Sequence, residues 1–159
     1  MIRRLALAAL ALAAACGEGT IVEVEPVPAD YTGWYRVDAT GAVPGHGDTY
    51  RIIYASEEAT TRGTADYVYP VGSVLVKEVR QRDGEQPGAV NYIAVMRKLR
   101  SADAPDGAEL HSANPLDDSG WLFTYLADDI ESDEEYRASC WETCHAAAPI
   151  DGAFLDYGQ

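Results

Sequence analysis

Short runs of β-branched and aromatic residues recur along the chain and predict β-strands. They are separated by stretches rich in Gly, Asp and Pro, such as Gly45–Asp48 and Ala104–Gly107, which are typical of turns. None of the runs is followed by a segment long enough for a helical crossover, so the pattern indicates an antiparallel sheet of about five strands. The expected strands are Trp34–Val37, Tyr50–Tyr54, Ser73–Val79, Asn91–Leu99 and Trp121–Leu126.

Two segments carry helical signals. Glu57–Arg62 predicts a short helix, and Ser132–Ala148 predicts a longer one at the C-terminal end of the chain. Ser132 is a candidate N-cap, and the three acidic residues after it suit the positive end of a helix dipole. The expected fold class is therefore mainly β (α+β), with a single C-terminal helix.

The N-terminal residues have the layout of a bacterial export signal. Arg3 and Arg4 precede the apolar run Leu5–Ala15, which at about eleven residues is too short to span a bilayer as a helix. Ala13–Ala15 ahead of Cys16 resembles the lipobox of lipoproteins, although the same residues also satisfy ordinary signal cleavage. We favour the lipoprotein interpretation, because a free thiol at an exported N-terminus is otherwise a reactive liability.

Composition adds limits on partners and location. We expect residues 1–15 to be the signal, 16–30 a lipidated tether, and 31–159 one domain in the periplasm, attached to the membrane only through Cys16. The net charge of −14 argues against a nucleic-acid partner, because phosphate binding requires clustered Lys and Arg. An acidic surface suits a basic redox partner, but solubility alone is the commoner explanation.

The strongest chemical signal lies near the C-terminus. Beyond Cys16 the sequence has two cysteines, Cys140 and Cys144, and His145 follows the second directly. In c-type haem sites two thiols add to the porphyrin vinyl groups, and the adjacent histidine is an axial iron ligand. The usual spacing places two residues between the cysteines, whereas three lie between them here. Because positions four apart share a helix face, both thiols can reach one porphyrin edge; alternatively Cys144 alone forms a thioether.

Two other interpretations of these residues remain. An oxidising periplasm permits a disulfide between Cys140 and Cys144, but a bridge over so few residues constrains the unfolded chain little. A zinc site is weaker, because Cys140, Cys144 and His145 supply three ligands and no second cluster is evident.

Several further pieces stand in order between Trp34 and Tyr157. They are Tyr50–Tyr54, Val71–Val79, Asn91–Met96, Gly120–Phe123, Cys144–Ala147, and Asp151 ahead of Phe154. With them the chain resembles the cytochrome P-460 family and its relative cytochrome c′-beta. The resemblance implies a small exported β-sheet protein with one covalently attached haem c, commonly a homodimer, that binds or oxidises small nitrogen compounds such as hydroxylamine or nitric oxide.

The same resemblance assigns roles to two residues on the expected strands. Lys77 corresponds to the lysine that bonds covalently to a meso carbon of the porphyrin, and strand alternation places it beside Leu75 and Val79. Alternatively, Lys77 extends to solvent or pairs with a carboxylate such as Asp66. Arg51 corresponds to a distal-pocket arginine that stabilises a polar iron ligand, although an arginine on a strand is usually a solvated side chain.

The chain departs from the hydroxylamine-oxidising members in the distal carboxylate that relays protons. Its expected place is Met96 or a position between Trp121 and Tyr125, and none of these is acidic. A Met96 thioether as sixth iron ligand would give an electron-transfer cytochrome, but a methionine in a strand is more often core filler. His46 and His111 lie in loop-like stretches, so we interpret both as surface histidines.

The main hypothesis is a periplasmic c-type haem protein, with Arg51 and Lys77 as candidate catalytic residues. Its haem would be held by Cys140, Cys144, His145 and Lys77, with His145 on the iron. The alternatives are an electron-transfer cytochrome without a substrate and a haem-free domain with a Cys140–Cys144 disulfide.

Overall fold

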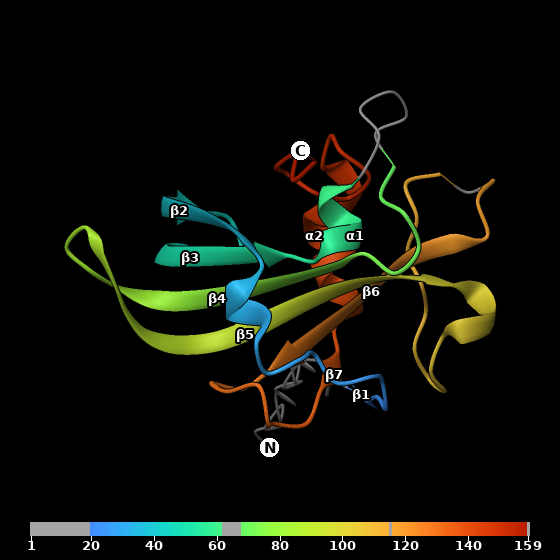
Figure 1. Cartoon of the computed structure of the whole chain (residues 1–159), viewed down its shortest axis with the longest axis horizontal. Coiled ribbons are helices and arrows are strands. Elements are labelled where there is room, and N and C mark those ends of the chain that lie inside the picture. The colour runs from blue at the N-terminus through green and yellow to red at the C-terminus, as the bar shows by residue number, and fades with distance from the viewer. Residues whose placement is uncertain (1–19, 62–67, 115, 159) are drawn as a thin grey trace, which may run out of the picture.

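The computed structural model describes residues 20–61, 68–114 and 116–158, which form one antiparallel sheet in the strand order β1-β7-β6-β5-β4-β3-β2 (Figure 1). The strands are β1 (Thr20–Ile21), β2 (Tyr35–Val43), β3 (Gly47–Ala55), β4 (Val74–Asp83), β5 (Gln86–Arg100), β6 (Ser119–Leu126) and β7 (Glu135–Tyr136). The helices are α1 (Glu57–Thr60) and α2 (Ala138–Thr143), with 3-10 turns η1 (Tyr31–Gly33), η2 (Ser101–Asp103) and η3 (His145–Ala147).

All five expected strands are present, and neighbouring strands pair antiparallel as predicted. The strand count is seven rather than about five, because β1 and β7 complete one edge of the sheet. Each of these two strands is two residues long, too short to give a recognisable period in the sequence.

The prediction of a helix over Ser132–Ala148 is wrong for most of that range. Tyr136 pairs with Thr124 as part of β7, and the Glu134 carboxylate lies 2.6 Å from the Arg97 guanidinium. Strand pairing and this buried ion pair therefore hold the first half of the segment extended, and the helix is confined to α2. Ser56 caps the short helix α1 through a hydrogen bond from the backbone N–H of Ala59, close to the predicted start. In the described ranges, no helix is long and apolar enough to cross a membrane.

Apolar side chains cover both faces of the sheet. The inner face, on which α2 and η3 pack, carries a buried cluster that includes Leu75, Met96 and Phe123. The outer face carries a second cluster that includes Val76 and Val95, and residues of the N-terminal segment pack against it. Both faces therefore exclude water, as alternation along the strands requires.

The N-terminal segment expected to be a tether contacts the sheet from residue 20 onward. Val22 and Val27 are buried, and the backbone N–H of Val22 donates to the carbonyl of Glu134. Cys16 and the signal residues lie outside the described part of the chain.

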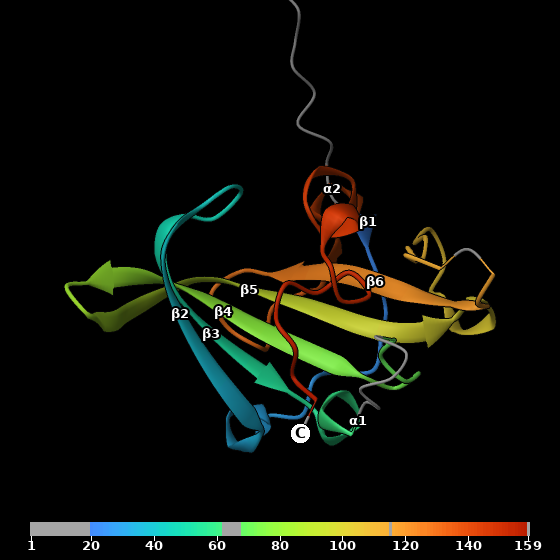
Figure 2. The same ribbon diagram turned by 90° about the horizontal axis from the view of Figure 1, so that it is seen from above.

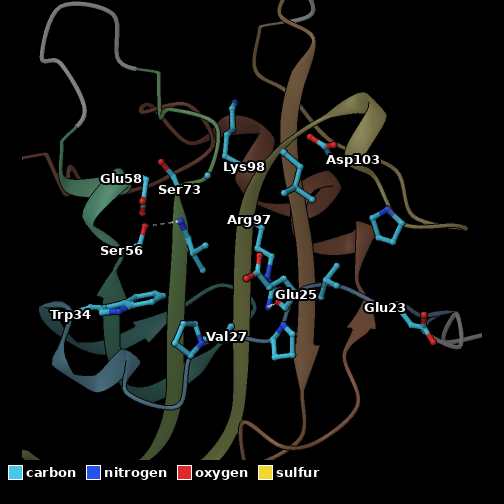
Figure 3. A pocket seen from close by; sticks show the side chains of 17 residues that line it. Glu23, Glu25, Val27, Trp34, Ser56, Glu58, Ser73, Arg97, Lys98 and Asp103 are labelled. Carbon is cyan, nitrogen blue, oxygen red and sulfur yellow. Dashed lines mark hydrogen bonds between the residues drawn. The ribbon is translucent and has the colours of Figure 1, made fainter.

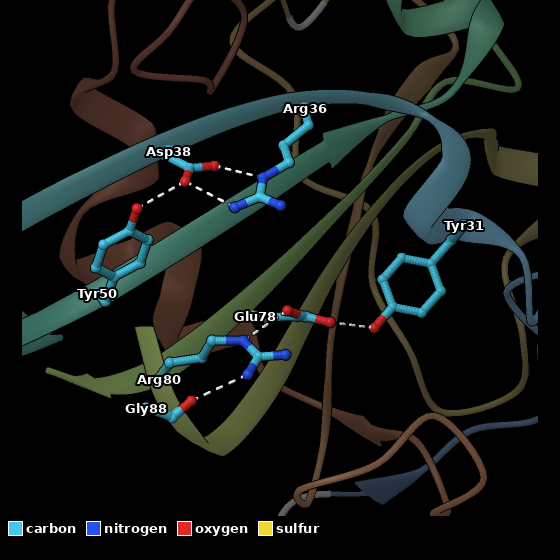
Figure 4. Close-up of polar contacts among 7 residues, drawn as sticks. All are labelled: Tyr31, Arg36, Asp38, Tyr50, Glu78, Arg80 and Gly88. Carbon is cyan, nitrogen blue, oxygen red and sulfur yellow. Dashed lines mark hydrogen bonds and ion pairs between the residues drawn. The ribbon is translucent and has the colours of Figure 1, made fainter. Parts of the chain in front are cut away.

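Polar networks on the outer face connect β4 to η1 and β2 to β3 (Figure 4). The Tyr31 hydroxyl donates to the buried Glu78 carboxylate at 2.5 Å, and Nε of Arg80 donates to the same carboxylate at 2.8 Å. Burial and this carboxylate raise the pKa of Tyr31. The second network is more exposed and joins Arg36, Asp38 and Tyr50.

Candidate functional site

Three polar side chains lie on the inner face, one each on β3, β4 and β5. Arg51 is opposite Val79, and Val79 is opposite Tyr92, so these residues form one row across the sheet. Lys77 belongs to the next row, opposite Ala94. Because alternate residues of a strand share a face, the side chains of Arg51, Lys77 and Tyr92 occupy neighbouring positions on one surface.

The hairpin between β2 and β3 brings His46 to this surface. Gly45 and Gly47, on either side of it, have φ values of +79° and +65°, which a side chain would disfavour. The His46 Nδ1 lies 2.6 Å from the Tyr92 hydroxyl, and its Nε2 lies 2.8 Å from Nζ of Lys77. Our interpretation of His46 as a surface residue is therefore wrong: its imidazole is half-buried, and both ring nitrogens have partners.

Arg51, Lys77 and His46 form a cluster of basic side chains on the inner face, and each of them is buried or half-buried. Burial lowers the pKa of Lys77 to about 8, and nearby Arg51 acts in the same direction. Burial likewise lowers the pKa of His46 to about 4, with the charges of Lys77 and Arg51 adding to the effect. Among the residues that the structure describes, no carboxylate is hydrogen-bonded to Lys77 or His46, and Asp66 lies outside them. The His46 imidazole is consequently neutral at pH 7.

Arg51 and Met96 also occupy defined places on the inner face. The Arg51 side chain is buried, and its Nη1 donates to the Gly41 carbonyl at 2.8 Å, so the alternative of a solvated arginine is wrong. Met96 lies between Leu75 and Phe123 in the strand register and packs in the apolar cluster.

The two thiols lie at the C-terminal segment that covers this face. Cys140 is within α2, and the helix ends just before Cys144, whose N–H donates to the Cys140 carbonyl. Cys140 and Cys144 thus do not lie on one continuous helix as expected, because α2 ends at Thr143 and Cys144 leaves the helical conformation with φ −136° and ψ −53°. Both thiols are free and half-buried, and burial raises the pKa of Cys140. Cys144 lies against the hairpin: a Cβ on Gly45 would be 3.9 Å from its sulfur.

The two ring nitrogens of His145 have different surroundings. Its Nδ1 lies 2.7 Å from the carbonyl oxygen of Gly152, so Nδ1 carries the proton and Nε2 is left with a lone pair. The ring is buried and lies 5.0 Å from that of Phe123 and 5.3 Å from that of Phe154, between centroids. Burial lowers its pKa to about 4, which keeps the imidazole neutral, the form that binds metals.

The loop that carries this carbonyl is fixed to the sheet by a buried ion pair. Nζ of Lys98, on β5, lies 3.0 Å from the Asp151 carboxylate. The Trp121 indole N–H donates to the Asp151 carbonyl, and the same carboxylate accepts from the backbone N–H of Tyr69. Sequence reasoning missed the role of Lys98, because the neighbouring Arg97 and Arg100 make this end of the strand look solvated. It also missed Gly152, which follows Asp151 in an Asp-Gly pair typical of a turn.

His111 is separate from this cluster. Its ring stacks between those of Tyr136 and Trp141, with interplanar angles of 8° and 10°. It is half-buried rather than a free surface histidine, and its Nε2 lies 2.8 Å from the Tyr136 hydroxyl.

The donor set of the inner face suits a covalently bound haem. It offers two thiols close to a neutral imidazole whose Nε2 has no hydrogen bond within the described ranges. Aromatic rings and buried cationic groups surround these donors. A porphyrin needs such an apolar environment, with thiols for its vinyl groups and one imidazole for its iron. The arrangement therefore fits the group that the Cys-His motif predicts.

A cavity of about 530 Å³ lies on the outer face, away from this cluster (Figure 3). The N-terminal segment, Trp34 and Val74 contribute to its wall, and the Ser56 hydroxyl accepts a hydrogen bond from the Val74 N–H beside it. Of the residues predicted to form the haem site, none lines this cavity.

Comparison with known proteins identifies the family of the chain. A family model described as Cytochrome P460 matches residues 28–151, which is most of the chain. Neither a curated protein nor a solved structure gave a significant match.

Proposed function

The chain belongs to the cytochrome P460 family, and on this premise we propose that it is a c-type haem protein whose iron binds or oxidises small nitrogen compounds such as hydroxylamine or nitric oxide. One observation carries the proposal. The thiols, the imidazole of His145, and the basic side chains of Lys77 and Arg51 are close enough to interact electrostatically. They come from the sheet and from the C-terminal segment, whose helix α2 lies over one face of the sheet (Figure 2).

In the proposed holoprotein, Cys144 and Cys140 form thioethers and Nε2 of His145 binds the iron. The hydrogen bond to Gly152 orients this ring and raises its basicity toward the metal. The haem iron supplies a coordination position for a small ligand and exchanges electrons with it. The protein contributes an apolar site that limits the access of water.

Lys77 and Arg51 give the site its basic character. The lowered pKa of Lys77 makes its neutral, nucleophilic amine accessible near pH 8. Arg51 stays charged and is held by the Gly41 carbonyl, so it can stabilise a polar ligand through its remaining N–H groups. Both residues are proposed to face the ligand.

We further propose that the protein is exported to the periplasm, lipidated at Cys16, and dimeric. The apolar run after Arg3 and Arg4 supports export, and the alanines before Cys16 support lipidation. Dimer formation rests on family resemblance.

The decisive experiment is export from a host that matures c-type cytochromes, followed by intact mass and absorption spectra. We expect the mass of one haem on the wild-type chain, and loss of that mass from the variant with Cys140→Ser, Cys144→Ser and Lys77→Met together. Cys144→Ser with Cys140→Ser alone should lose every thioether. The single variants show whether one or two thioethers form. His111→Gln, which changes a histidine outside the cluster, should retain the full added mass. A wild-type polypeptide without that mass would overturn the proposal.

A peptide map of the same protein tests Lys77. A peptide in which Lys77 is joined to the haem-bearing peptide indicates the covalent bond, and Lys98 provides an internal comparison because these are the two lysines of the sequence. Free Lys77 peptide in the loaded protein would contradict the bond but not the haem site.

A further inference from the structure

A series of aromatic rings in contact connects His145, the proposed iron ligand, with the surface of the molecule. The ring of Phe123 lies 5.0 Å from that of His145 between centroids, and the ring of Trp141 lies 6.1 Å from that of Phe123. The His111 imidazole is nearly parallel to the Trp141 indole at 5.7 Å and to the Tyr136 ring at 6.2 Å. The series therefore begins in the proposed haem segment and ends at the half-buried Tyr136 on β7.

Two carboxylates flank the outer end of this series. Glu109 and Glu142 are exposed, and neither is ion-paired with a residue that the structure describes. Burial lowers the pKa of His111, whereas both carboxylates act to raise it. Burial also raises the pKa of Tyr136, and the charges of the same two carboxylates add to that shift. The outer two rings therefore lie in a negative local field.

We infer that the surface formed by Glu109, His111, Tyr136, Trp141 and Glu142 is the docking site for a one-electron carrier protein with a basic surface. The inference rests on the proposed function and adds a partner to it. Exposed carboxylates attract a basic partner and orient it, because complementary charges guide association and fix the register of a complex. The net charge of −14 provides the same attraction at longer range.

The place of this docking site suits electron exchange with the proposed haem. In the transfer, one electron leaves the ferrous iron and reduces the oxidised carrier, and no bond forms or breaks. Trp141 lies in α2 next to Cys140, so a carrier on this surface is close to the segment that would hold the porphyrin. None of the residues that line the outer-face cavity belongs to the series of rings, so that cavity offers no comparable connection.

Calorimetric titration of the ferric holoprotein with ferric mitochondrial cytochrome c, a basic one-electron carrier, tests the docking site without turnover. We expect the affinity to fall as salt is raised, because exposed charges are screened. Glu109→Lys with Glu142→Lys should weaken binding at low salt by about tenfold, because like charges then face each other. Asp83→Lys with Glu85→Lys is the matched control, since it reverses two exposed carboxylates at the β4–β5 turn. There we expect a loss of at most about threefold.

Carbodiimide cross-linking of the same complex locates the contact. The reagent joins a carboxylate to a lysine amine with loss of water, so peptides that contain Glu109 or Glu142 should carry the cross-links. Equal losses of affinity in the two charge-reversed variants, no salt-dependent binding of the wild type, or cross-links confined to other carboxylates would each overturn the docking site.

These measurements use haem-loaded protein, so a negative result leaves the proposed function standing. A wild-type chain without the mass of haem would overturn the proposed function and the docking site together. The two failures are therefore distinguishable by the mass of the exported protein.

Discussion

The ammonium of Lys98 lies 3.0 Å from the Asp151 carboxylate, and their side chains are 0% and 3% exposed. Lys98 belongs to β5, whereas Asp151 lies in the C-terminal segment next to the carbonyl that holds His145. The ion pair therefore ties the segment that carries His145, the proposed iron ligand, to the centre of the sheet. Asp151 has a φ of +43°, a conformation that its carboxylate and carbonyl contacts stabilise.

Removing one partner of this pair should be strongly destabilising. Lys98→Met leaves the Asp151 carboxylate buried without its cation, and we expect a loss of about 3–5 kcal/mol in the free energy of unfolding, measured by denaturant titration. Combining Lys98→Met with Asp151→Asn removes the second charge and keeps an acceptor for the Tyr69 N–H. The double variant should recover part of the loss, and equal stability of the single and double variants would argue against a role for the unpaired charge.

Gly152→Ala should disturb the same segment by a steric route. Gly152 has a φ of +80°, and a Cβ there would lie 2.9 Å from an indole carbon of Trp141. We expect the free energy of unfolding, measured by thermal or denaturant titration, to fall by on the order of 2–4 kcal/mol. The absorption spectrum of the haem-loaded variant should also change, because the surroundings of His145 are altered. Gly84→Ala is the control: its φ is +61°, but no atom lies within 4 Å of its added Cβ. If both variants lose the same amount, backbone strain alone explains the effect.

The outer-face tyrosines should differ in their contribution to stability. Tyr31→Phe removes a hydrogen bond to the Glu78 carboxylate, whose side chain is 4% exposed, and we expect a loss of about 1–2 kcal/mol. Tyr50→Phe removes a hydrogen bond to Asp38, whose side chain is 35% exposed and already paired with Arg36, so its effect should be smaller. Urea titrations of both variants at pH 7 measure the difference, and the reverse order would contradict it.

His46 should make the fold sensitive to mild acid. Its pKa is about 4 in the folded protein and 6.5 ordinarily, so the unfolded chain binds more protons between these values. Stability is therefore lost as the pH falls from about 6.5 to 4, by on the order of 2–3 kcal/mol for this residue. His46→Gln should have a flatter stability profile over that window than the wild type. His111 and His145 are present in both proteins, so their titration does not contribute to the difference; parallel profiles would show that His46 is accessible to protons.

The inner strands were predictable because each has a run of residues with a clear period. β7 was not, because the acidic residues of 132–135 satisfy the rules for a helix start, whereas strand pairing and the contact of Glu134 with Arg97 hold the segment extended. That contact joins residues far apart in the sequence, which local propensity cannot detect.

In the candidate site, too, the sequence pointed to residues with a local signal and missed those whose role depends on contacts far along the chain. Cys144 and His145 were predicted as haem-site residues from their adjacency and Lys77 from the family resemblance of its strand, and these roles stay predictions. His46 was misjudged because a histidine between two glycines is locally typical of a surface turn, and the hydrogen bonds to Tyr92 and Lys77 arise from strand pairing. The role of Lys98 likewise depends on a partner more than fifty positions later in the chain.

The position of the Cys-His segment at the end of the chain implies an order of assembly. Every strand of the sheet precedes Ala138, the first residue of α2, so in the proposed export all strand residues emerge before the two thiols. In the proposed assembly, haem binds to the sheet face that carries Lys77 and Arg51 before residues 140–152 pack against that face. A chain truncated before Trp121 would lack residues 140–152. It would also lack the Trp121 indole, whose N–H holds this segment through the Asp151 carbonyl.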